Sequence, residues 1–79
     1  MEKQELDQKV LGFVSSAYKK PLEELSLETN IKKDLGGTSL FMVGLVSLIE
    51  NELDVLLPLP TAAGCKTIGD LVDAVARLM

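Results

Sequence analysis

The sequence predicts an all-α protein: a small four-helix bundle with three main helices, a short third helix and a long first loop. Two observations carry this prediction. Apolar residues recur at helical spacing in three long segments, and strand-like alternation persists in none. The 79 residues are enough for one domain, which we expect to span 1–79. The core must be aliphatic, because only Phe13, Tyr18 and Phe41 are aromatic.

The first helix is predicted from about Glu2 to Lys19. Pro21 disfavours helical geometry at Lys20, so the helix should end there. Its apolar residues fall within one stripe, with two more at the edge: Leu6, Val10, Phe13, Val14 and Ala17, then Leu11 and Tyr18.

A long connection follows, from about Lys20 to Thr38, and it is too long to lack structure in a compact domain. Pro21 suits the first turn of a short helix, and Thr29 or Asn30 could cap a further turn. We expect five apolar residues to hold the connection against the core: Leu22, Leu25, Leu27, Ile31 and Leu35.

The second helix is predicted from Ser39 to Leu53, with Phe41 and Val43 on its flanks. Its core-facing stripe comprises Met42, Leu45, Val46, Ile49 and Leu53. Its opposite face comprises Leu40, Gly44, Ser47 and Asn51.

The remaining helices are a short turn at Thr61–Cys65, weakened by Gly64, and a clearer last helix. Thr67 followed by Asp70 fits a capping box at the start of that last helix. The apolar stripe beyond the cap comprises Ile68, Leu71, Val72, Val75, Leu78 and Met79.

Composition excludes several classes of function. The chain has no histidine and one cysteine, which excludes an internal disulfide, the usual His/Cys metal sites and histidine-dependent nucleophilic catalysis. The net charge of −4 and the lack of a basic helix disfavour nucleic acid, including a helix-turn-helix mode of binding. No apolar run is long enough for a membrane span, and residues 1–5 hold no apolar signal core, so we expect a cytoplasmic protein.

Residues 34–40 form the segment with the clearest chemical meaning. Gly36 and Gly37 lack side chains, which lets a partner approach Ser39. A phosphate ester on Ser39 would sit at the positive end of the second helix, favoured by about 0.3–1 kcal/mol. Taken alone, the segment also fits an ordinary loop and helix cap. Cys65 is interpreted as a small apolar residue rather than a reactive thiol.

The chain resembles the acyl carrier and peptidyl carrier family in several blocks of sequence. These are Asp34-Leu35-Gly36-Gly37-Thr38-Ser39-Leu40, Val43-Gly44-Leu45-Val46-Ser47-Leu48-Ile49-Glu50, Leu53-Asp54-Val55-Leu56-Leu57-Pro58 and Thr67-Ile68-Gly69-Asp70-Leu71. The resemblance implies a four-helix bundle in which Ser39 receives 4′-phosphopantetheine from coenzyme A. It also implies that the residues flanking Ser39 serve recognition: Asp34, Gly36, Gly37, Thr38 and Leu40.

The chain departs from the fatty-acid type of this family in informative places. Thr38 stands where that type has Asp, and Phe41 and Gly44 stand where it has acidic residues early in the second helix. Gly-Gly-Thr-Ser and Leu57-Pro58-Leu59 are closer to peptidyl carriers. We therefore predict a more apolar docking face for partners, comprising Phe41, Val43, Gly44, Ser47 and Glu50. The alternatives are that Phe41 and Val43 pack under the first loop and that Gly44 permits tight packing.

The resemblance thus predicts a discrete carrier rather than an enzyme. Acyl or aminoacyl groups would be held as thioesters on the Ser39 arm, for a specialised lipid, polyketide or peptide-type pathway. The expected partners are a phosphopantetheinyl transferase, an acyl- or aminoacyl-activating ligase and a downstream transferase or synthase, with the carrier itself monomeric and not inserted in membranes. The alternative is a carrier-like scaffold that binds proteins and is never modified.

Overall fold

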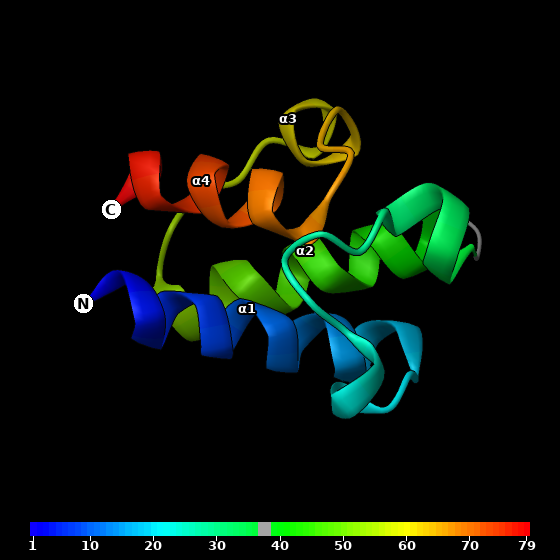
Figure 1. The fold of residues 1–79 in the computed structure, drawn as a ribbon. Helices are drawn as coiled ribbons and strands as arrows, with labels where there is room; N and C mark the ends of the chain where they lie inside the picture. Colours follow the sequence, from blue (N-terminus) through cyan, green and yellow to red (C-terminus); the bar gives the residue numbers. More distant parts are fainter. Residues whose placement is uncertain (37–38) are drawn as a thin grey trace.

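The computed structural model describes residues 1–36 and 39–79, and these form a helical bundle (Figure 1). The predicted all-α fold is confirmed, with one isolated backbone bridge, between Asn30 and Thr67, as the only β-type pairing in the described residues. The elements in order are α1 (Lys3–Tyr18), a 3₁₀ turn η1 (Leu22–Glu24), a π-helical turn η2 (Ile31–Leu35), α2 (Ser39–Leu53), α3 (Leu59–Ala63) and α4 (Ile68–Leu78).

Helix α1 is the central element, because it packs against both α2 and α4. Figure 1 shows both chain ends at one end of the bundle, whereas α2 begins at the other end. The short helix α3 lies beside the start of α4. Ser39, the first residue of α2, is therefore carried on the end of the bundle away from the termini.

The core is aliphatic, as predicted, with Tyr18 as its one aromatic member among the described residues. Each fully buried Leu, Ile or Val contributes about 1.5–3 kcal/mol through burial. The core comprises Leu6, Val10, Leu11, Val14, Tyr18, Ile31, Met42, Leu45, Val46, Ile49, Leu57, Ala62, Cys65, Ile68, Leu71, Val72, Ala74 and Val75.

Some expectations about apolar residues were wrong. Leu22 was expected to hold the first connection to the core, but it is 47% exposed on η1, a turn that buries none of its residues. Leu78 and Met79 were expected in the core stripe of the last helix, but they are 42% and 54% exposed. They lie at the end of the bundle beside the N-terminus, past the core (Figure 1).

The predicted position of the third helix was also wrong by two residues. α3 begins at Leu59 and ends at Ala63, rather than occupying Thr61–Cys65. Pro58 precedes the helix in an extended conformation. Pro60 lies in the first turn, where backbone N–H groups have no acceptor within the helix, so its missing N–H costs no hydrogen bond. Gly64 then ends the helix instead of lying within it.

The end of α1 follows the prediction from Pro21. Lys19 adopts the left-handed conformation, with φ of 56°, and its N–H donates to the Ser15 carbonyl. The Ser15 hydroxyl in turn donates to the Lys20 carbonyl at 2.6 Å. These bonds satisfy carbonyl groups at the helix end and turn the chain into the first loop.

The first loop is held by the start of α4. Three backbone hydrogen bonds join them, from the Ile31 N–H to the Lys66 carbonyl (2.9 Å), from the Ile68 N–H to the Thr29 carbonyl (3.1 Å) and from the Gly69 N–H to the Leu27 carbonyl (2.8 Å). The first N–H groups of a helix have no partner within it, so these loop carbonyls satisfy donors that would otherwise be left open.

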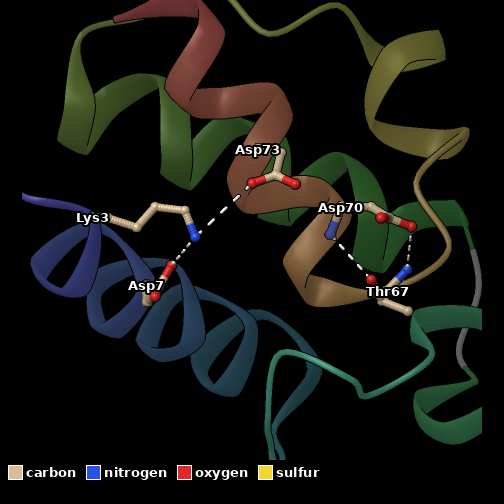
Figure 2. A network of polar contacts seen from close by, with 5 residues as sticks. All are labelled: Lys3, Asp7, Thr67, Asp70 and Asp73. Atoms are coloured by element: carbon tan, nitrogen blue, oxygen red, sulfur yellow. Dashed lines mark hydrogen bonds and ion pairs between the residues drawn. The ribbon is translucent and has the colours of Figure 1, made fainter.

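The predicted capping box completes the start of α4 (Figure 2). The Asp70 N–H donates to Thr67 Oγ1 at 3.0 Å, and the N–H groups of Thr67 and Lys66 each donate to Asp70 Oδ2 at 3.2 Å. Figure 2 also shows Lys3 of α1 between Asp7, at 3.2 Å, and Asp73 of α4, at 3.9 Å. This second contact is solvent-exposed and contributes little to stability.

We predict that Gly69→Ala destabilises the protein although Ala is the better helix former. A Cβ at this position would lie 3.0 Å from the Leu27 carbonyl oxygen, which is the acceptor of the Gly69 N–H. Relieving that contact lengthens the bond, and we expect a loss of about 1–3 kcal/mol in urea unfolding. Gly12→Ala is the matched control, because its Cβ meets no atom within 4 Å. Equal stabilisation by both substitutions would contradict this account.

Candidate functional site

Ser39 is the first residue of α2 and is exposed to solvent. Its side chain lies at the helix N-terminus, where backbone N–H groups favour an anion. The first turn of α2 carries no acidic residue, and the sequence holds no charged side chain from Ser39 to Ile49. A negatively charged phosphodiester on the Ser39 hydroxyl therefore meets no like charge on this stretch of the helix.

Gly36 ends η2 with φ of 62° and ψ of −141°. Residues with a side chain rarely adopt this conformation, so the backbone itself favours glycine at this position. The predicted role of Gly36 in giving a partner access to Ser39 stays a prediction. The predictions for Gly37 and Thr38 concern positions outside the described residues. Gly36 thus supplies a sharp change of chain direction shortly before the candidate attachment residue.

Asp34 has a structural role that the sequence reading missed. Its Oδ2 accepts a hydrogen bond from the Asn30 N–H at 2.8 Å. Asn30 Oδ1 accepts from the Lys33 N–H, also at 2.8 Å, which confirms Asn30 as one of the two predicted caps. The two side chains brace η2, and the spacing of an Asn followed four residues later by an Asp was the available signal. Recognition of Asp34 by a partner stays a prediction.

The predicted docking residues lie on the surface of α2. Leu40, Phe41 and Val43 are 74%, 38% and 43% exposed, and Gly44 and Ser47 are exposed too. Leu40, Val43, Gly44 and Ser47 share one face, because residues three, four and seven apart align on a helix. An apolar surface thus begins directly beside Ser39. From here on, the name docking face refers to the exposed residues Leu40, Phe41, Val43, Gly44 and Ser47. This set adds Leu40, which was predicted as a recognition residue flanking Ser39, and omits Glu50. Docking of a partner there stays a prediction.

Phe41 is partly packed, but its ring contact is with helix α1 rather than with the first loop, which was the alternative. Its ring meets Tyr18 of α1 edge to face, with 5.6 Å between centroids and 81° between ring planes. Such pairs contribute about 0.5–1.5 kcal/mol beyond burial. The contact fixes one edge of the ring while more than a third of the residue stays exposed.

Gly44 does not serve tight packing within the chain. A Cβ added there would meet no atom within 4 Å among residues 1–36 and 39–79, so no neighbouring helix or loop in this part of the chain requires glycine. Glycine within a helix costs about 1 kcal/mol relative to alanine. No packing contact among the described residues offsets this cost.

Glu50, which was included among the docking residues, has a partner within the chain. Its Oε2 accepts a hydrogen bond from the Leu57 N–H at 2.8 Å. Leu57 is 2% exposed, so the bond holds the connection between α2 and α3 where this leucine enters the core. Because Glu50 lies in α2 and Leu57 lies seven residues later in the connection after the helix, no local sequence pattern revealed the contact.

Cys65 is buried, at 8% exposure, and its Sγ donates to the Thr61 carbonyl at 3.4 Å. Burial raises the pKa of the Cys65 thiol, and the Asp70 carboxylate raises it further, while Arg77 lowers it. The interpretation of Cys65 as a small apolar residue agrees with these properties, because the reactive species of a cysteine is the thiolate.

We predict that iodoacetamide alkylates Cys65 at least about tenfold more slowly in the folded protein than in urea at pH 8, since both burial and the raised pKa suppress the thiolate. Intact-mass measurement over time gives both rates, and a free cysteine in a short peptide is the reference. Equal rates in the folded and unfolded chain would contradict the assignment. Slow alkylation also keeps Cys65 distinct from any thiol attached at Ser39.

A search for membrane-spanning segments finds, in the described part of the chain, no helix long and apolar enough to cross a bilayer.

Comparison with known proteins agrees with the site. A family model described as "Phosphopantetheine attachment site" matches residues 8–75. The acyl carrier protein of Prochlorococcus marinus (strain MIT 9515) is 36% identical over 91% of this chain and 90% of its own length. The acyl carrier protein of Clostridium perfringens (strain SM101 / Type A) is 38% identical over 70% of this chain and 72% of its own length.

The family model and the Prochlorococcus relative cover most of the bundle, and the family model includes all of α2. The prosthetic group of such a protein is 4′-phosphopantetheine, held covalently, and its role is to carry rather than to catalyse. The chain belongs to the phosphopantetheine-binding acyl carrier protein family.

Proposed function

We propose that Ser39 is the attachment residue, and that the protein carries acyl or aminoacyl groups for a specialised pathway. The observation that supports it best is an exposed serine at the first position of α2, shortly after a glycine with positive φ. When bound, the prosthetic group supplies a thiol that holds the cargo as a thioester. The chain's own contribution is to expose the Ser39 hydroxyl and to present the docking face beside it.

The attachment step balances as a phosphoryl transfer. The Ser39 oxygen forms a bond to the pantetheine-bearing phosphorus of coenzyme A, and the phosphoanhydride bond breaks. Adenosine 3′,5′-bisphosphate leaves, and the serine proton passes to a base of a separate transferase. An activating ligase then loads the cargo, and a transferase or synthase consumes it. Tethering raises the effective concentration of the cargo for each of these enzymes.

The specialised pathway is proposed from the charge of α2. The helix has no acidic residue before Glu50, and the Glu50 carboxylate is engaged by the chain's own Leu57 N–H. An enzyme that recognises a carrier through basic residues therefore finds few acidic partners near Ser39. The docking face offers exposed Leu, Phe and Val side chains instead, which fit an apolar partner surface.

The direct test is incubation with coenzyme A, magnesium and a broad-specificity phosphopantetheinyl transferase, followed by intact-mass measurement. The wild-type protein is expected to gain one phosphopantetheine mass and Ser39→Ala none. Ser16→Ala, a change at an exposed serine of α1, should gain the mass as the wild type does. An unmodified wild type would favour the scaffold alternative, and a modified Ser39→Ala would place the attachment elsewhere.

The docking face is tested with a bulky residue at Gly44. Gly44→Met should fold, since a Cβ meets no atom there, and should unfold at higher urea, because methionine is the better helix former by nearly 1 kcal/mol. We expect the side chain to obstruct the partner, so kcat/KM for modification by the transferase should fall at least about tenfold.

Gly12→Met is the matched control, because Gly12 also lies within a helix and has open space at Cβ. It should gain similar stability and be modified at the wild-type rate. Equal modification of the Gly44→Met and wild-type proteins would show that the partner does not approach this face.

A further inference from the structure

A hollow of about 340 Å³ lies between η2 and the connection from α3 to α4. Its volume falls within the range of small-molecule sites, about 300–1,000 Å³. The residues that line it are Asn30, Lys32, Lys33, Gly64, Cys65 and Lys66.

The charge of this hollow is opposite to that of the protein. Three of its lining side chains are lysines and none is a carboxylate, whereas the whole chain has a net charge of −4. Lys32, Lys33 and Lys66 are exposed, and none makes an ion pair or a side-chain hydrogen bond with another described residue. Three lysines and no carboxylate around one hollow give it a positive charge, which favours an anion there.

The acidic residues nearest in sequence do not occupy this position. Asp34 Oδ2 accepts from the Asn30 N–H, and Asp70 Oδ2 accepts from the N–H groups of Lys66 and Thr67. Both carboxylates are held at helix starts and neither lines the hollow. The lysines are thus left to face solvent or a ligand.

The hollow lies within reach of the end of the bundle that carries Ser39. Lys33 precedes Ser39 by only six residues, and six residues span at most about 22 Å even when fully extended. Figure 1 shows η2 beside the start of α2 and the connection to α4 above it.

We propose that this hollow binds the anionic end of the cargo: an acyl group with a distal carboxylate, held on the arm at Ser39. This rests on the proposed attachment at Ser39 and deepens it by naming the cargo class. Lys32, Lys33 and Lys66 pair with the carboxylate. The same lysines repel an ammonium group, so an aminoacyl cargo is disfavoured here.

The test compares three cargoes of equal length on the same arm. The transferase loads glutaryl-, pentanoyl- and 5-aminopentanoyl-pantetheine from the matching coenzyme A thioesters, and intact mass verifies each product. Backbone amide and lysine side-chain NMR signals are then compared. Glutaryl alone should shift the signals of Lys32, Lys33 and Lys66, and raising the salt concentration should remove the shift.

Two variants with the same net charge distinguish the effect of the lysines at the hollow from the effect of a change in overall charge. Changing the three lysines of the hollow to glutamine should abolish the difference between glutaryl and pentanoyl. The control changes three lysines elsewhere to glutamine and should retain the difference; these are Lys9, Lys19 and Lys20.

The outcomes are distinguishable from failure of the attachment itself. If no arm is installed, the proposed function fails at the mass measurement, before any cargo is compared. If glutaryl loads but shifts the lysine signals no more than pentanoyl does, the assignment of the hollow is overturned. The last comparison adds free glutarate to the pentanoyl-loaded protein. An equal shift at equimolar free glutarate would overturn the cargo assignment in favour of a soluble anion.

Discussion

The backbone hydrogen bonds between the first loop and the first turn of α4 are the constraint on which the functional end of the protein depends. The loop carbonyls of Leu27 and Thr29 accept hydrogen bonds from the N–H groups of Gly69 and Ile68, respectively. In the other direction, the Ile31 N–H donates to the Lys66 carbonyl. Ile31, at 1% exposure, is thereby fixed in the core at the start of η2. Since η2 ends at Leu35, the chain reaches Ser39 from a fixed point four residues away.

The surface around Ser39 follows from how α2 divides its residues. The buried side of α2 consists of Met42, Leu45, Val46 and Ile49. The first turns of its other side, including Leu40, Val43 and Gly44, are exposed to solvent. The exposed residues of α2 near Ser39 are apolar or uncharged. The nearest charged turn, η2, carries Lys32, Lys33 and Asp34, and the Asp34 carboxylate accepts a hydrogen bond from the Asn30 N–H. In the function proposed above, the uncharged start of α2 selects partners with an apolar surface, and the lysine-lined hollow selects an anionic cargo.

Sequence reasoning succeeded where the information is local. The positions of α1 and α2 and the capping box at Thr67 depend on residues within a few positions, so period and cap predicted them. Within α1 the stripe was offset: Leu11 and Tyr18, expected at its edge, are buried. Phe13 and Ala17, expected within it, are only half-buried. It failed at Leu22, since a three-residue turn has no period to set which side faces the core. The Glu50–Leu57 bond and the hollow beside Lys66 arise from segments brought together by folding, which no local pattern encodes. Exposure of the docking face was predictable in outline, because the buried stripe of a helix defines the opposite face.

Native-state hydrogen exchange of the amides of Ile31, Ile68 and Gly69 tests most directly whether the loop and α4 form one unit. If they do, these amides exchange as slowly as that of Val10 in the centre of α1, because opening them requires unfolding the bundle. Exchange orders of magnitude faster than Val10, with α1 still protected, would show that the loop detaches on its own. The position of Ser39 would then not depend on α4, and the central claim would be contradicted.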